Sequence, residues 1–258
     1  MTMPGRSESD DQEQPLVAHL VELRQRMLRA IAVLFAVFLC LVPFANSVFT
    51  EFAAPLLRAL PAGSSMIATE VASPFLTPIK LAFFVAVIIT MPMTLYQSWA
   101  FVAPGLYRHE KRLATPLLIS SALLFYLGCA FAYYLVLPVV FRFLTGVAPE
   151  GVAVMTDITH YLDFVMVMFL AFGICFEVPV AVVILVALNW VTIEQLQKSR
   201  GYVIIGAFFV GAVLTPPDIL SQIMLAIPMC ILYEVGIIAA RMAIKKPVAD
   251  GVESSGPL

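Results

Sequence analysis

The segment 98–112, SWAFVAPGLYRHEKR, decides how the chain is organised, because it is a polar connector between two long apolar runs. It places four basic or potentially basic side chains around a single carboxylate, Glu110. A second segment, 18–29 (AHLVELRQRMLR), has the same character, with Glu22 among three arginines. Most of the remaining sequence is apolar and of helical length. These two polar segments are therefore where we look first for recognition chemistry.

The composition indicates an all-α polytopic membrane protein. Of the 258 residues, 61% are hydrophobic and only 12% are charged, which is unlike a soluble domain. Several apolar runs are long enough to cross a hydrocarbon core about 30 Å thick. We predict six transmembrane helices, at residues 27–44, 79–100, 113–140, 161–190, 202–214 and 219–243.

The parts outside these spans are of two kinds. The connection 45–78 carries apolar residues at helical spacing, which predicts a short amphipathic helix lying on the membrane or over the bundle. Residues 1–15 and 244–258 are polar, and we predict that both are disordered tails around one membrane domain at 16–243.

The distribution of lysine and arginine predicts the orientation. With the N-terminus inside, twelve of the fifteen basic residues fall on cytoplasmic segments, and only Arg58, Lys80 and Arg142 fall on the opposite side. Such an excess is typical of the cytoplasmic face. Both termini are then cytoplasmic, the segment 98–112 is a cytoplasmic loop, and Glu22 lies at the cytoplasmic mouth of the first span.

The sequence contains no recognisable catalytic or nucleotide-binding signature. It has no phosphate-binding GxxxxGK[ST] loop, no HExxH zinc pair and no GxSxG nucleophile elbow. The four cysteines lie in apolar runs without CxxC or Cys/His spacing, so we interpret them as small buried hydrophobic residues. We expect no enzyme activity, no cofactor, no metal and no nucleic-acid partner.

Glu177 is the most informative polar residue at membrane depth. An ionisable group near the middle of a span is energetically costly and is a functional candidate by default, and Pro179 disrupts the turn at the Cys175 carbonyl. The alternative is a structural acid, protonated or paired within the bundle. Gln97, Thr215 and Gln222 are weaker candidates, because such groups often only join helices to one another.

The two cytoplasmic carboxylates also allow two interpretations. A carboxylate can bind an arginine guanidinium through two charge-assisted hydrogen bonds, so Glu22 and Glu110 could together hold two adjacent arginines of a peptide. Alternatively, Glu22 pairs with Arg26 one helical turn away and Glu110 pairs with a basic neighbour. The spacing alone favours these ordinary pairs.

Several motifs, in order and with their spacing, resemble the TatC family, the multispanning subunit of the bacterial twin-arginine translocase. They are HLVELRQRMLR (19–29), MIATEVASPFLTPIK (66–80), YQSWAFVAPGLYRHEKR (96–112), FLAFGICFEVPVA (169–181) and GAFFVGAVLTPPDILSQ (206–222). The resemblance covers about residues 14–241. It implies a cup-shaped bundle of six helices in the inner membrane, with both termini cytoplasmic.

The resemblance also implies a function. The protein would be the receptor for folded cargo whose signal peptides carry two adjacent arginines, would work with the single-span subunits TatA and TatB, and would use the proton-motive force. It would also associate with itself in a multimeric receptor complex and contact membrane lipids. A proton-coupled small-molecule transporter is the alternative, but we find neither the internal repeats nor the paired broken helices of that class.

The resemblance reverses the weighting of the two carboxylates, because in the family the acids at the positions of Glu22 and Glu110 recognise the signal-peptide arginines. The surrounding patch would comprise His19, Arg24, Phe101, Tyr107, Arg108 and Arg112. Glu177 and Gln97 would contact an inserted signal peptide or a partner helix. The residues Thr215, Asp218 and Gln222 would dock TatA or TatB, and Pro55 and Pro74 would shape the first periplasmic loop.

Overall fold

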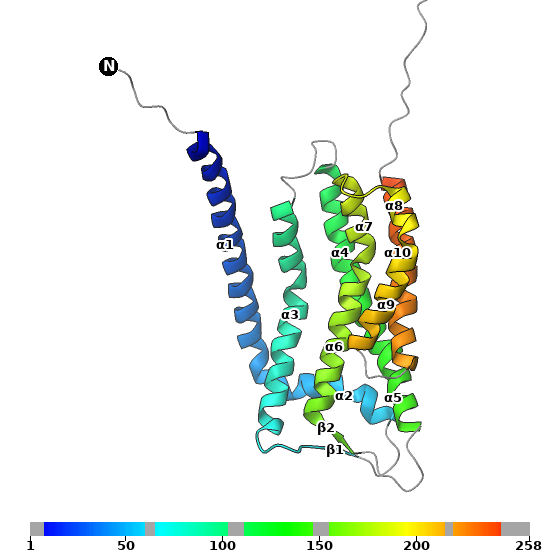
Figure 1. The fold of residues 1–258 in the computed structure, drawn as a ribbon. Coiled ribbons are helices and arrows are strands. Elements are labelled where there is room, and N and C mark those ends of the chain that lie inside the picture. Colours follow the sequence, from blue (N-terminus) through cyan, green and yellow to red (C-terminus); the bar gives the residue numbers. More distant parts are fainter. Residues whose placement is uncertain (1–7, 60–64, 103–110, 147–154, 215–218, 244–258) are drawn as a thin grey trace, which may run out of the picture.

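The computed structural model describes residues 8–59, 65–102, 111–146, 155–214 and 219–243. The regular elements in these residues are helices, apart from two strands of two residues each (Figure 1). Five stretches are long and apolar enough to cross a membrane: Leu23–Arg58, Ser73–Ser98, Thr115–Gly146, Ile158–Ala187 and Gln222–Met242. The shorter apolar helix Arg200–Leu214 is the sixth. The prediction of an all-α polytopic membrane protein is therefore confirmed.

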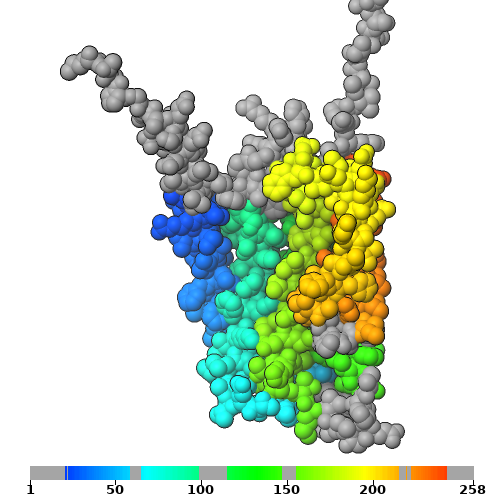
Figure 2. Space-filling view, viewed as in Figure 1, coloured from blue at the N-terminus to red at the C-terminus, as the bar shows by residue number. Residues whose placement is uncertain are grey.

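The first helix, α1 (Glu8–Leu41), begins inside the segment that the sequence suggested would be a tail. Helix α1 thus extends into the predicted tail, and the domain boundary at residue 16 stays a prediction. The acidic residues that made this segment look disordered lie in the first turns of α1, where negative charge complements the helix dipole. The helix packs mainly on α3 (Ser73–Val102) and occupies one edge of the molecule, as Figure 2 shows in blue.

The predicted amphipathic helix is α2 (Ala45–Ala59), which follows the short 3-10 helix η1 (Val42–Phe44) and crosses one end of the bundle (Figure 1). It buries Ala53 and Leu56 and exposes Arg58. Pro55 lies inside this helix. Pro74 lies in the first turn of α3, where its missing N–H is harmless. That helix begins earlier than the predicted residue 79.

The third span is one long helical rod with an irregular middle. It comprises α4 (Lys111–Phe131), the π-helix η3 (Ala132–Val136) and α5 (Leu137–Gly146). The predicted end at residue 140 was therefore too early. The fourth span comprises α6 (Ile158–Phe176) and α7 (Val178–Ala187), which meet at Glu177.

The last part of the chain contains one helix that the sequence did not predict. The short helix α8 (Ile193–Lys198) begins with a capping box, in which Thr192 and Gln195 exchange hydrogen bonds. The helices α9 (Arg200–Leu214) and α10 (Ile219–Ala243) follow closely the predicted fifth and sixth spans. An ion pair between Arg200 and Glu234, with N and O 2.7 Å apart, joins α9 to α10.

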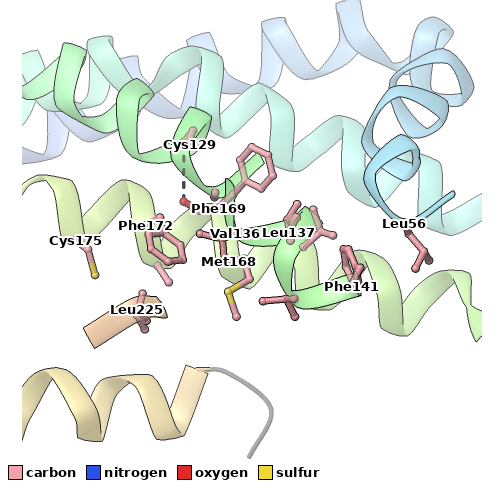
Figure 3. Packing of buried hydrophobic residues seen from close by; sticks show 14 of the residues in the cluster. Leu56, Cys129, Val136, Leu137, Phe141, Met168, Phe169, Phe172, Cys175 and Leu225 are labelled. Atoms are coloured by element: carbon pink, nitrogen blue, oxygen red, sulfur yellow. Dashed lines mark hydrogen bonds between the residues drawn. The ribbon is translucent and has the colours of Figure 1, made fainter. Parts of the chain in front are cut away.

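The core lies where α4, η3 and α5 pack against α6 (Figure 3). Its centre is aromatic, and Phe169 and Phe172 of α6 lie among side chains from the neighbouring helices. The two helices approach closely at Gly128 and Gly173. A Cβ on Gly128 would lie 2.5 Å from the Phe172 carbonyl oxygen, so only glycine fits there.

The cysteines only partly follow their prediction. All four are free thiols, and Cys129 and Cys175 are buried, but Cys40 is exposed on α1 and Cys230 is intermediate. The prediction of burial was wrong for Cys40, because α1 contacts few other helices and leaves apolar side chains on its outer face.

Both ends of the described chain lie at the same end of the bundle (Figure 1). The start of α1 and the finish of α10 are there, while α2 and the two strands are at the opposite end. Strands β1 (Met66–Ile67) and β2 (Thr156–Asp157) pair in parallel, with Ile67 opposite Asp157. The first and last described helices therefore meet one end of the bundle, and the membrane side of the termini and the cup shape stay predictions.

Candidate functional site

The described residues include only part of the predicted cytoplasmic site. Tyr107, Arg108, Glu110, Thr215 and Asp218 lie outside them. For His19 and Glu22 in α1, Phe101 in α3 and Arg112 in α4 the structure describes the helix but not the side chain. The start of α1, the end of α3 and the start of α4 lie at the end of the bundle where α10 finishes (Figure 1).

Glu177 lies at the break between α6 and α7, with its side chain partly buried in the bundle. Pro179 has no N–H to donate to the Cys175 carbonyl, and the Glu177 N–H donates to the Ile174 carbonyl at 3.0 Å. The predicted disruption of this turn is confirmed. The break ends α6 at membrane depth and leaves Glu177 at the junction of two helices.

The two carboxylate oxygens of Glu177 have different surroundings. Oε2 accepts a hydrogen bond of 2.6 Å from the Ser121 hydroxyl of α4. Oε1 is buried and has no hydrogen-bond partner. An unsatisfied buried polar atom costs about 1–3 kcal/mol, and native structures contain few of them. The orphaned oxygen is therefore the strongest sign of an unoccupied contact in the part of the chain that the structure describes.

A pocket of about 240 Å³ adjoins this carboxylate. Its lining is almost entirely apolar and comes from α3, α4 and α7, with Leu95, Val180 and Ile184 among its members. Ser121 and Glu177 supply the polar groups on one wall, and Ser98 of α3 lies on another. Such a lining suits an apolar helix or extended chain that presents one hydrogen-bond donor.

A second pocket, of about 210 Å³, lies between α1 and α3. Its lining includes Arg26, Gln97 and Ser98, and the Arg26 guanidinium donates a 3.3 Å hydrogen bond to Gln97 Oε1. Because Ser98 lines both pockets, they are neighbours along α3. Together they extend along α3 from its contact with α1 to Glu177.

The third predicted region is the hairpin of α9 and α10. The Gln222 side-chain amide donates a 2.9 Å hydrogen bond to the Phe208 carbonyl of α9. A Cβ on Gly211 would lie 3.1 Å from the Gln222 side chain. Gln222 thus joins the two helices, which is the alternative role that the sequence left open for it.

The sequence did not predict a hydrogen-bond network at the opposite end of the bundle, which we call the polar clasp, formed by Asp157 with Thr69, Thr159 and His160. Asp157 is buried and accepts four hydrogen bonds. Two come from the hydroxyl and N–H of Thr69, at 2.7 and 3.0 Å, and two from the N–H groups of Thr159 and His160, at 2.8 and 3.2 Å. The hydrogen bonds from Thr69 hold the pKa of Asp157 well below its ordinary value.

Part of this clasp was detectable in the sequence. An aspartate just before an apolar run is a helix N-cap signal, and Asp157 caps α6. Its partner Thr69 is 88 residues away, and no local pattern predicts that contact. Among the described residues no group of three or more His, Cys, Asp or Glu side chains could hold a metal ion.

The family described as Sec-independent protein translocase protein (TatC) matches residues 18–228. The TatC chain of Escherichia coli strain K12 is 56% identical over 92% of each chain. That of Haemophilus influenzae is 52% identical over 95% of this chain and 96% of its own. The crystal structure of a twin-arginine translocase receptor, TatC, superposes with a TM-score of 0.76 at 38% identity, covering 87% and 99% of the two chains.

Proposed function

The chain belongs to the TatC family of Sec-independent protein translocase proteins, and on that premise we propose that it is the signal-peptide receptor of a twin-arginine translocase. It is a multi-pass membrane component of a bacterial transport system. The observation that carries the proposal is the near full-length similarity to a solved receptor of the same fold. Similarity to translocase proteins favours this function over small-molecule transport.

The proposed location is the inner membrane, with both termini in the cytoplasm. Twelve of the fifteen basic residues then face the cytoplasm. The common end of α1 and α10 supports the same side for both termini (Figure 1). The polar segment 98–112 is then available to cytoplasmic precursor proteins before export.

The proposed recognition residues for the two signal-peptide arginines are Glu22 and Glu110. Carboxylates bind guanidinium groups through paired, charge-assisted hydrogen bonds that a lysine cannot reproduce. Glu22 lies in α1, and Glu110 immediately precedes α4 in sequence. The surrounding patch would consist of His19, Arg24, Phe101, Tyr107, Arg108 and Arg112, where the bases also anchor the topology.

The two pockets along α3 are the proposed path for the apolar part of the signal peptide. They extend from the α1–α3 face beside Gln97 to Glu177, and their walls are mainly apolar. An inserted helix, from a signal peptide or a partner subunit, would bring a donor to the unpartnered Oε1 of Glu177. Photocrosslinkers placed at Leu95 and Ala181 should then capture the signal peptide, and capture of lipid alone would contradict this path.

The proposed partners are TatA and TatB, docking at the α9–α10 hairpin near Thr215, Asp218 and Gln222, and further copies of this chain. The proposed energy source is the proton-motive force, in keeping with the absence of a nucleotide-binding motif from the sequence.

The decisive test is peptide binding in detergent, comparing a signal peptide that carries Arg-Arg with one that carries Lys-Lys. Wild-type protein should prefer Arg-Arg, and Glu22→Ala and Glu110→Ala should each weaken it by about 10- to 100-fold, as expected for the loss of a charge-assisted hydrogen bond. Glu194→Ala, which removes an exposed carboxylate from α8, is the matched control. Equal binding of the two peptides by wild-type protein would overturn the assignment.

Export supplies the second readout. Glu110→Lys places a positive charge where the signal-peptide arginines are expected, so export of twin-arginine cargo should cease while the variant still inserts into the membrane. Normal export by that variant would contradict the role of Glu110.

A further inference from the structure

Two arginines at the α2 end of the bundle line one pocket. Arg58 of α2 and Arg142 of α5 surround a volume of about 260 Å³ together with Pro55, Tyr133, Tyr134 and Pro138. Both arginine side chains are exposed. Within the described part of the chain neither forms an ion pair. The described lining thus carries two positive charges and no carboxylate.

Arg58 and Arg142 are two of the few basic residues on their side of the membrane, so their meeting at one pocket is notable. Only three basic residues lie on the side of the membrane where basic residues are depleted. One of them, Lys80 of α3, forms an ion pair with Asp163 of α6. The other two, Arg58 and Arg142, are 84 positions apart in sequence and still reach the same pocket. The nearby carboxylate of Glu51 is on α2 but outside the described lining.

The backbone around the pocket is specialised. Tyr133 and Tyr134 lie in the π-helix η3, a rare wide turn that is frequent at functional sites. Pro138 follows it and has no N–H to donate to that turn. On the other wall, Pro55 cannot donate to the Glu51 carbonyl, and the Tyr133 hydroxyl donates to that oxygen at 3.0 Å. This bond fixes Tyr133 and leaves the pocket open.

An apolar stripe leads away from the pocket along the third span. Ile119, Leu123 and Leu127 are four residues apart and lie on one face of α4. All three are exposed, as are Tyr134, with 77% of its surface accessible, and Leu135. A ligand that fits both features needs an anionic head for the arginines and a long apolar tail for the stripe.

We propose that this pocket binds the phosphate of an anionic phospholipid, with its acyl chains along the stripe of α4. Guanidinium groups bind phosphate oxygens in pairs, which distinguishes them from a lysine point charge. Tyrosine is favoured where a membrane passes from hydrocarbon to headgroups. The proposal rests on the orientation given above, in which this end of the bundle faces away from the cytoplasm.

The test measures lipid retention by the purified protein in native mass spectrometry. Wild-type protein should retain one molecule of added phosphatidylglycerol more tightly than phosphatidylethanolamine. The double variant R58Q/R142Q should weaken that binding by at least about tenfold, which corresponds to about 1.4 kcal/mol. R241Q, which removes an exposed arginine from the last turn of α10, is the matched control and should bind like wild type.

Two further arms make the result decisive. The charge-preserving variant R58K/R142K should recover only part of the affinity, because lysine lacks the paired geometry. Inorganic phosphate at millimolar concentration should not displace the lipid, since it lacks the acyl chains. Unchanged retention by R58Q/R142Q, an equal loss with R241Q, or displacement by inorganic phosphate would each overturn the proposal. Twin-arginine peptide binding should persist in R58Q/R142Q, so this result is distinguishable from a failure of the proposed receptor function.

Discussion

Two carboxylates in this protein have opposite surroundings. Asp157, at the α2 end of the bundle, accepts four hydrogen bonds. Glu177, within the fourth span, accepts one from Ser121 and has a buried oxygen without a partner beside an apolar pocket. Both residues interrupt or begin a helix, and both contact side chains from another element.

The difference separates a structural acid from a candidate contact site. Both carboxylate oxygens of Asp157 accept hydrogen bonds from groups of the same chain. These hydrogen bonds join the segment of Thr69 to the start of α6. One carboxylate oxygen of Glu177 has no hydrogen-bond partner, as expected for a group that binds a donor from another molecule.

The largest effect should come from Gly128→Val. It disturbs the α4–α6 crossing, which sets the separation of Ser121 from Glu177. The new side chain would meet the Phe172 backbone, which cannot move as a flexible side chain could. We expect a loss of about 3 kcal/mol in the free energy of unfolding, near the upper end for overpacked cores. Gly206→Val, with nothing within 4 Å of the added Cβ, is the control. Equal melting temperatures for the two variants would show that the crossing is not tight.

Asp157→Ala should have the next largest effect on stability. It removes the acceptor of four hydrogen bonds, leaves the Thr69 groups without their partner and uncaps α6. The melting temperature in detergent should fall by roughly 5 °C or more. Arg-Arg peptide binding should be retained at temperatures below the transition. Glu70→Ala, an exposed neighbour of Thr69, should melt like wild type.

Glu177→Leu should give the reverse result. The substitution removes an unsatisfied buried acceptor, so the melting temperature should be unchanged or slightly higher. Export should fall by about tenfold or more, equivalent to about 1.4 kcal/mol of lost contact energy. Ser121→Ala should reduce export less, because the carboxylate remains. A strong fall in the melting temperature of Glu177→Leu would identify Glu177 as a structural acid instead.

The smallest expected effect is a fall in the melting temperature at acidic pH. The pKa of Asp157 is lowered in the folded protein relative to an ordinary value of about 3.9. Its contribution to stability is therefore fully present above that value and is lost as the pH falls toward the lower folded pKa. The melting temperature of wild type should fall by a few degrees between about pH 5 and pH 3. Asp157→Asn should melt lower at pH 7 and show a smaller fall over that interval.

The spans were predictable because the hydrocarbon thickness of the bilayer fixes how long an apolar helix must be to cross it. The bounds of α10 agree with the prediction, and the break at Pro179 was located to the residue. The start of α1 could not be predicted. Glu8 and the residues after it are polar, and a polar composition is compatible with either a helix or a disordered segment. Helix α8 was missed for a similar reason, since its six residues are too short for a periodic pattern.

The site was predictable only where its chemistry was local. Glu177 was conspicuous because a charge in an apolar run is costly. Its partner Ser121 and the clasp of Thr69 with Asp157 depend on contacts 56 and 88 positions apart, which no periodicity encodes. The hydrogen bond from the Gln222 amide to the Phe208 carbonyl is also between two helices, and the docking role of Gln222 stays a prediction. The pocket at Arg58 could not be predicted from the sequence, because its second arginine, Arg142, belongs to another helix.

The length of α9 has a consequence for the surrounding bilayer. Its 15 residues span about 22 Å at 1.5 Å per residue, which is less than a hydrocarbon core of about 30 Å. We predict that lipid beside this helix thins or bends to keep apolar surface covered, at a fraction of a kcal/mol for each ångström. Hydrophobic mismatch is thus built into one edge of the protein. Reconstitution in bilayers of increasing acyl-chain length should destabilise that edge before it affects the central helices.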